Sequence, residues 1–128
     1  MMTRSSFSNP VQELADKGFN TKAGIGYCAG DEDFYLEMLG TFAEEWEEKS
    51  KAILDDYENT DIADYQIRVH ALKSTAKTIG ADELSVKALE QEQAAKAGDI
   101  AAIDRGVRPL LDLYADTVEH IKRATGRD

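Results

Sequence analysis

The sequence has little cysteine and no long apolar run. Its one cysteine, Cys28, can form no internal disulfide and no thiolate metal site, so we interpret it as a small buried hydrophobic residue of a protein in a reducing compartment. No segment approaches the roughly 18 consecutive apolar residues of a membrane span. The first residues, MMTRSSFSNP, lack the apolar stretch of a secretory signal. We therefore expect a cytoplasmic protein that does not bind membranes.

Basic residues are also scarce. The chain has 15 Lys and Arg residues against 25 Asp and Glu residues, a net charge of -10 and a pI of about 4.6. Nucleic acids and anionic membrane surfaces attract dense positive charge, so neither is an expected partner. A length of 128 residues is typical of one domain with its own core. We expect residues 1–7 to form a flexible tail and residues 8–128 to form a single domain.

Proline is limited to two residues, while alanine, glutamate, lysine and leucine are common. This composition, together with the spacing of the apolar residues, predicts an all-α protein. A short first helix is predicted to start at Pro10, after Asn9 as its N-cap, and to end at Gly18. Residues 19–29 are expected to hold at most one irregular turn, with Thr21 as its cap.

Four longer segments show the apolar spacing of amphipathic helices. The first is predicted to be one helix over residues 30–57, and the second to span about residues 62–79, where Gly80 ends it. The third starts with Asp82 as its cap. The fourth contains Pro109, which we expect to kink the helix without dividing it. The apolar positions predicted to face the core are Phe34, Met38, Leu39, Phe42, Trp46 and Ile53, then Ile62, Tyr65, Val69, Leu72, Ala76 and Ile79, then Leu84, Ala88, Leu89 and Ala95, and finally Ile100, Ile103, Val107, Leu110, Tyr114, Val118 and Ile121.

Amphipathic helices joined by short turns favour one architecture. It is an antiparallel up-down four-helix bundle, here with the short N-terminal helix covering one end. Such a bundle buries the apolar side of each helix within one chain, so we expect a monomer.

One of the two histidines, His70, lies in the second long segment within the stretch VHALKSTAKTIGADEL. At about 100° per residue, His70 falls well away from the apolar side of its helix and is expected to project into solvent. Its predicted neighbours on the outer side are Gln66, Lys73, Ser74 and Lys77, with Ile67 beside them as a partly exposed apolar residue.

The surroundings of His70 are cationic in sequence. Residues 66–81 contain no acid, whereas Arg68, Lys73 and Lys77 are basic. Nearby positive charge disfavours imidazolium, so we expect a neutral imidazole with a free lone pair, which is a nucleophile. Lys73 lies one turn after the histidine and leans back over it, so its ammonium can hold an anion such as a phosphoryl group, with Lys77 adding attraction at longer range.

These residues resemble a known family. The stretch HALKSTAKTIGA is similar to the signature of histidine-containing phosphotransfer (HPt) domains of bacterial phosphorelays, which is His, any residue, an apolar residue, Lys and usually Gly, with a later GA or GL. GDEDFYLEMLGTF resembles the helix that precedes this signature, and LEQEQAAKAGD resembles the end of the helix that follows. The likeness covers roughly residues 19–122.

The resemblance implies a phosphorelay intermediate. His70 would accept the phosphoryl group from a phosphoaspartate of a receiver domain, in a response regulator or a hybrid kinase, and pass it to an aspartate of another receiver. Lys73 would stabilise that group, and Ser74 stands where the family usually has glycine. The receiver holds its own Mg²⁺, so no cofactor or metal is expected in this chain. The expected docking positions around His70 are Ala63, Gln66, Ile67 and Ala71.

Two other functions are consistent with the same residues. One is a helical adaptor that binds response regulators without carrying phosphate, although the presence of both His70 and Lys73 disfavours it. The other is a histidine-bearing substrate domain phosphorylated by a separate chemotaxis-type kinase. The chain has no P-loop and no glycine-rich phosphate cradle, so we expect a phosphocarrier and not an enzyme with autokinase activity.

Overall fold

The computed structural model describes residues 9–126, and this part of the chain forms helices and no strand. The helices are α2 (Pro10–Asp16), α3 (Thr21–Tyr27), α4 (Glu32–Glu44), α5 (Trp46–Glu58), α6 (Ile62–Thr78), α7 (Asp82–Ala97) and α8 (Ile100–Thr125). The all-α class is therefore confirmed. The tail predicted for residues 1–7 lies outside the described residues. None of the helices in residues 9–126 combines the length and apolar content that a membrane crossing requires.

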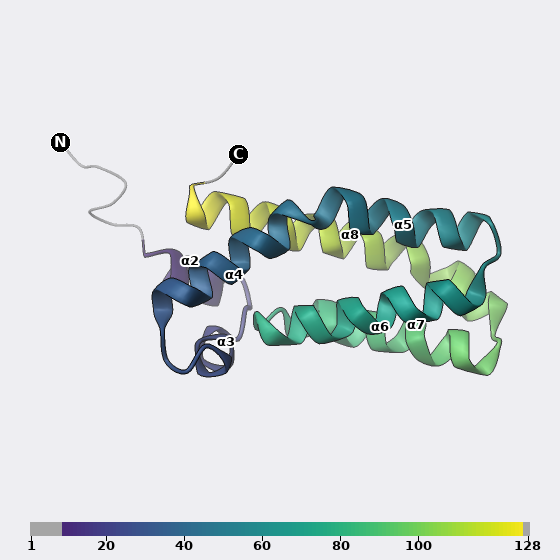
Figure 1. Ribbon diagram of the computed structural model, residues 1–128, viewed down its shortest axis with the longest axis horizontal. Helices are drawn as coiled ribbons and strands as arrows, with labels where there is room; N and C mark the ends of the chain where they lie inside the picture. Colours follow the sequence, from purple (N-terminus) through teal and green to yellow (C-terminus); the bar gives the residue numbers. More distant parts are fainter. Residues whose placement is uncertain (1–8, 127–128) are drawn as a thin grey trace.

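The long helices pack side by side, and the two short helices lie at one end of the molecule (Figure 1). Helices α6 and α7 form an antiparallel pair with the most extensive contact, and α7 also packs on α8. Helices α4 and α5 follow one another along α8, and α5 contacts α6 as well. The short helices α2 and α3 contact each other, α2 packs on α8, and α3 packs on α4 and α6. The core lies between these helices.

The segment predicted as one helix over residues 30–57 is divided at Glu45 into α4 and α5. The chain keeps its direction across this break, because Glu45 has helical φ and ψ of -83° and -9° and its amide donates to the Thr41 carbonyl of α4. The predicted apolar stripe was wrong at Phe34, which is 50% exposed, while its neighbour Tyr35 is fully buried. The Tyr35 hydroxyl donates to the carbonyl of Ile79 at 2.8 Å, so this contact with the end of α6 turns Tyr35 inward.

Two predicted caps are each displaced by one residue. Asn20, not Thr21, caps α3, which is a regular helix and not an irregular turn. Helix α7 has Ala81 at its N-cap position, so Asp82 is the first helical residue and makes no capping hydrogen bond. Asp82 still favours the start of α7 because a negative charge there interacts with the helix dipole.

The turn between α6 and α7 depends on Gly80, which has a φ of +81° and is buried. A Cβ at this position would lie 2.3 Å from the carbonyl oxygen of Asn20, whose own amide donates to the Gly80 carbonyl at 2.7 Å. Only glycine fits this close approach without strain. The next contact along the pair is the Ser85 hydroxyl, which donates to the Lys73 carbonyl at 2.9 Å. The turn at Gly80 and the Ser85 hydrogen bond together set the register of α7 against α6.

Helix α8 is a single helix that contains Pro109, so the prediction that this proline does not divide the segment is confirmed. Pro109 is exposed, and so is Arg105, the residue whose carbonyl loses its helical partner at the proline. Most of the predicted apolar positions of α8 are buried, but Ile100 is 46% exposed at the first turn. In α7, Leu89 is 36% exposed and was wrongly placed in the core.

Candidate functional site

Helix α6 holds His70 at the middle of its outer side. The helix begins at the N-cap Asp61, whose side chain accepts from the amide of Asp64, and its inner side buries Tyr65, Val69, Leu72 and Ala76. The side chain of His70 is 57% exposed, as the helical spacing predicted. A rigid, well-packed helix therefore presents the imidazole at the surface.

The carboxylate of Glu92, on α7, lies directly beside the histidine. Its Oε2 is 2.5 Å from Nδ1 of His70, and its Oε1 accepts a hydrogen bond of 2.8 Å from Nζ of Lys73. A third basic group, Nζ of Lys96, is 3.6 Å from Oε2. Glu92 is only 2% exposed, so one buried carboxylate joins three basic side chains from two helices.

Sequence reasoning missed Glu92. Residues 66–81 contain no acid, but the site itself does, because Glu92 comes from the neighbouring helix. One signal in the sequence marked it: Glu92 shares a face of α7 with Ser85, Ala88 and Ala95, all of which are buried. A glutamate on an apolar helix face needs a partner of opposite charge.

The protonation state of this cluster follows from the environment of Glu92. The hydrogen bond from Lys73, assisted by the contact with His70, lowers the pKa of Glu92 to about 2 even though burial raises it. The group is therefore a carboxylate at neutral pH and can only accept hydrogen bonds. Nδ1 of His70 must then carry a proton. In the neutral ring, the lone pair is left on Nε2, the nitrogen that Glu92 does not contact.

The remaining predicted site residues are spread along α6. The side chain of Lys73 is 26% exposed, and its ammonium donates to Glu92. The spacing along α6 alone predicts an ammonium that lies over the imidazole and is available to an anion. Ser74 and Lys77 are exposed, one and two turns after His70. Ser74 also borders a shallow hollow against Met38 and Phe42 of α4.

The predicted docking positions surround the histidine. Ala63, Ile67 and Ala71 are exposed, and Gln66 is partly buried. Ile67 is 65% exposed, more than any other large hydrophobic residue in the part of the chain that the structure describes. Such a side chain is typical of an interaction surface when other apolar atoms adjoin it.

A group of carboxylates with metal-ligand spacing lies at the turn between α5 and α6. Oxygens of Asp56, Asp61 and Asp64 are all within 4.8 Å of one another. Asp56 forms an ion pair with Arg68, and Asp61 caps α6, so two of the three already have structural partners. We therefore interpret this group as part of the helix turn.

Comparison with known proteins extends these observations. The family model of the Hpt domain matches residues 37–124. A stretch of 48 residues, 38% of this chain, is 44% identical to the phosphorelay protein LuxU of Vibrio cholerae serotype O1. That match covers 42% of the relative, so less than half of its length is compared. No solved structure matches the chain significantly.

Proposed function

Because this chain belongs to the Hpt domain family, we propose that it is a phosphorelay intermediate that carries a phosphoryl group on Nε2 of His70. The donor is a phosphoaspartate of one receiver domain, and the acceptor is an aspartate of another. The similarity to a phosphorelay protein supports this role. The observation that supports the choice of atom is the contact of Glu92 with Nδ1, which leaves Nε2 as the nucleophile.

The transfer is an in-line displacement at phosphorus. The lone pair of Nε2 forms a bond to phosphorus while the bond from phosphorus to the aspartyl oxygen breaks, and the aspartate leaves as a carboxylate with the bonding pair. The imidazole keeps its Nδ1 proton and becomes positively charged. The adjacent Glu92 carboxylate offsets that charge, since it is already ionised and fixed in position. Transfer to the second receiver reverses these bond changes.

Lysines stabilise the phosphoryl oxygens in this proposal. The ammonium of Lys73 has three hydrogens and donates one to Glu92, so it can donate another to the phosphoryl group on the same histidine. Lys96 lies near enough to Glu92 to balance its charge when Lys73 turns toward the phosphate. Ser74 offers a hydroxyl one turn from His70, and Lys77 adds longer-range attraction.

The receiver supplies the rest of the active site. We propose that its Mg²⁺ stays in its own acidic pocket, and that this chain contributes a nucleophile and cations without a cofactor. The exposed positions Ala63, Gln66, Ile67 and Ala71 form the docking patch. We propose that α4 with α5, α6, α7 and α8 are the four helices of the up-down bundle and that α2 and α3 cover its end. The monomeric state and the cytoplasmic location stay predictions.

The test is phosphorylation followed by intact mass measurement. The purified chain is incubated with a panel of receiver domains phosphorylated by acetyl phosphate, and its mass is read at neutral and acidic pH. We expect one phosphoryl adduct that is lost in acid, because phosphohistidine is acid-labile. A His70→Gln variant should form none, whereas a variant of the other histidine, His120→Gln on α8, should behave as the native chain does. Binding of receivers without any adduct would refute the proposal and favour an adaptor.

A further inference from the structure

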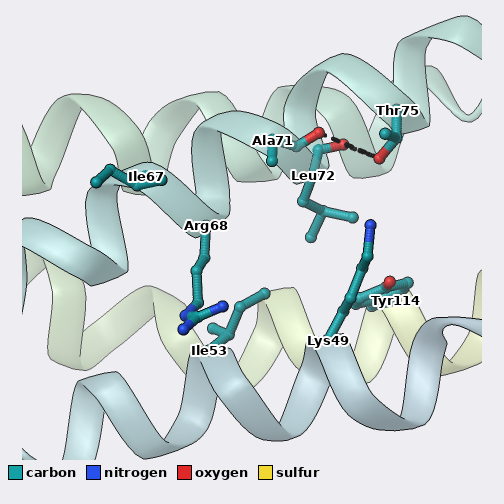
Figure 2. Close-up of a pocket in the computed structure, with 8 residues that line it drawn as sticks. All are labelled: Lys49, Ile53, Ile67, Arg68, Ala71, Leu72, Thr75 and Tyr114. Atoms are coloured by element: carbon teal, nitrogen blue, oxygen red, sulfur yellow. Dashed lines mark hydrogen bonds between the residues drawn. The ribbon is translucent and has the colours of Figure 1, made fainter.

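A groove of about 200 Å³ runs between α5 and α6 beside the His70 face (Figure 2). Its floor is apolar and includes Ile53 of α5 and Leu72 of α6. Its α6 wall includes Ile67 and Ala71, which are also the predicted docking positions closest in sequence to His70. The groove and the histidine therefore open on adjoining parts of one surface.

Two cations border this groove from opposite walls. Figure 2 shows Lys49 extending from α5 toward α6 and Arg68 reaching from α6 toward α5. Arg68 is held by Asp56, whose side chain is only 13% exposed. Lys49 pairs instead with Glu45 at 3.1 Å, and both side chains of this pair are about half exposed. A surface pair of this kind is weak, so the Lys49 ammonium exchanges partners readily.

We propose that this groove receives an apolar side chain of the docking receiver domain, next to a receiver carboxylate that pairs with Lys49. The inference rests on the proposed phosphotransfer, because a receiver that brings its aspartate to His70 must cover Ile67 and Ala71. An apolar floor beside an exchangeable cation fits an occupant that is apolar and carries a carboxylate. Lys49 is then a specificity residue on a helix that carries none of the reacting groups.

The test compares two lysines of the same helix. Lys49 and Lys51 each form an i,i+4 pair with an acid, and Lys51 does not line the groove. Lys49→Glu and Lys51→Glu therefore change the net charge by the same amount. Each variant also leaves two acids one helical turn apart. For each variant we measure transfer from the fastest receiver of the panel and, separately, phosphorylation by phosphoramidate, a small donor that needs no docking.

We expect Lys49→Glu to raise the KM for the receiver by about tenfold without a matching loss of the phosphoramidate rate, and we expect this effect to shrink at high salt. The KM of Lys51→Glu should stay within about twofold of the native value. Ala71→Leu, which narrows the groove, should also raise the KM, whereas Ala101→Leu, at an exposed position of α8, should not.

Equal effects of the two lysine variants on the KM would overturn the inference. A dimer of this chain that Lys49→Glu dissociates would also overturn it, because the groove would then hold a second copy of the chain. Loss of phosphorylation from both donors in the native chain would instead refute the proposed chemistry at His70. The two failures are distinguishable, because only the second removes labelling by phosphoramidate.

Discussion

Glu92 and His70 are separated by 22 positions in the chain, yet the carboxylate Oε2 lies 2.5 Å from Nδ1 of the imidazole. The carboxylate is buried while the imidazole is exposed, so the pair joins the interior of the molecule to its surface. This relationship selects one ring nitrogen as donor and leaves the other as nucleophile.

The first prediction concerns the tautomer of His70. In the native chain, the neutral ring should carry its proton on Nδ1, whereas most free imidazoles favour a proton on Nε2. Glu92→Gln removes the charged acceptor, and phosphorylation by phosphoramidate should slow by roughly 10- to 100-fold, the equivalent of about 1.5–3 kcal/mol for a hydrogen bond to a charged group. Nitrogen-15 chemical shifts of the ring report the tautomer. Glu90→Gln, at an exposed position of α7, is the matched control and should change neither quantity.

The second prediction separates the two lysines of α6 that follow His70. Lys73→Gln keeps a donor for Glu92 but removes the positive charge, and should slow receiver transfer by about tenfold. Lys77→Gln removes a more distant charge and should slow it by about twofold. Initial rates at several salt concentrations measure both. A larger loss for Lys77→Gln would contradict the direct role given to Lys73.

The third prediction is a dependence of stability on pH. The pKa of Glu92 is lowered from its ordinary value of 4.5 to about 2 in the folded chain. A depressed carboxyl pKa contributes stability that is present above the unfolded-state value and is lost as the pH falls through the folded-state value. The stability advantage of the native chain over Glu92→Gln in urea unfolding should therefore shrink as the pH falls from 4.5 to 2. If the stability difference between the two chains does not change over this range, the pKa of Glu92 is not lowered in the folded chain.

The fourth prediction tests the turn that sets the register of α7. Gly80 and Gly98 both have positive φ, but only Gly80 has a neighbouring backbone within 4 Å of an added Cβ. Gly80→Ala should lower the free energy of unfolding by about 3 kcal/mol or more, from strain together with the clash against Asn20. Gly98→Ala has only the conformational strain and should lower it by about 1 kcal/mol. Urea unfolding followed by circular dichroism provides both free energies of unfolding. Similar losses for the two variants would show that the close approach of Asn20 to Gly80 adds nothing to the strain.

The fifth prediction concerns the docking patch. Ile67 is mostly exposed, so Ile67→Ala should change the stability by less than about 0.5 kcal/mol while raising the receiver KM several-fold. Ile100 is also exposed but lies at the start of α8, so Ile100→Ala should leave the KM unchanged. Thermal unfolding and initial rates of transfer distinguish lost docking from lost stability. Equal KM values for the two variants would exclude Ile67 from the docking surface.

The direction of His70 and the positions of most helices follow from the sequence alone. Both depend on interactions within a few residues: a helix repeats every 3.6 residues, so apolar spacing identifies the buried side and places His70 opposite to it. The same local rules explain why α8 continues through Pro109 once its apolar stripe is extended on both sides. Where local rules were wrong, as at Phe34 and Leu89, the apolar spacing fitted two neighbouring faces about equally well, and packing chose between them.

The chemical state of the site depends on packing between helices. The residue of α7 that meets His70 depends on the register of two helices, which is set by the turn at Gly80 and by contacts such as that between Ser85 and Lys73. Packing between helices brings Glu92 to Lys73 and His70, and it also forms the groove between α5 and α6. Helical periodicity assigns each residue to a face of its own helix, but it carries no information on which face of another helix lies opposite.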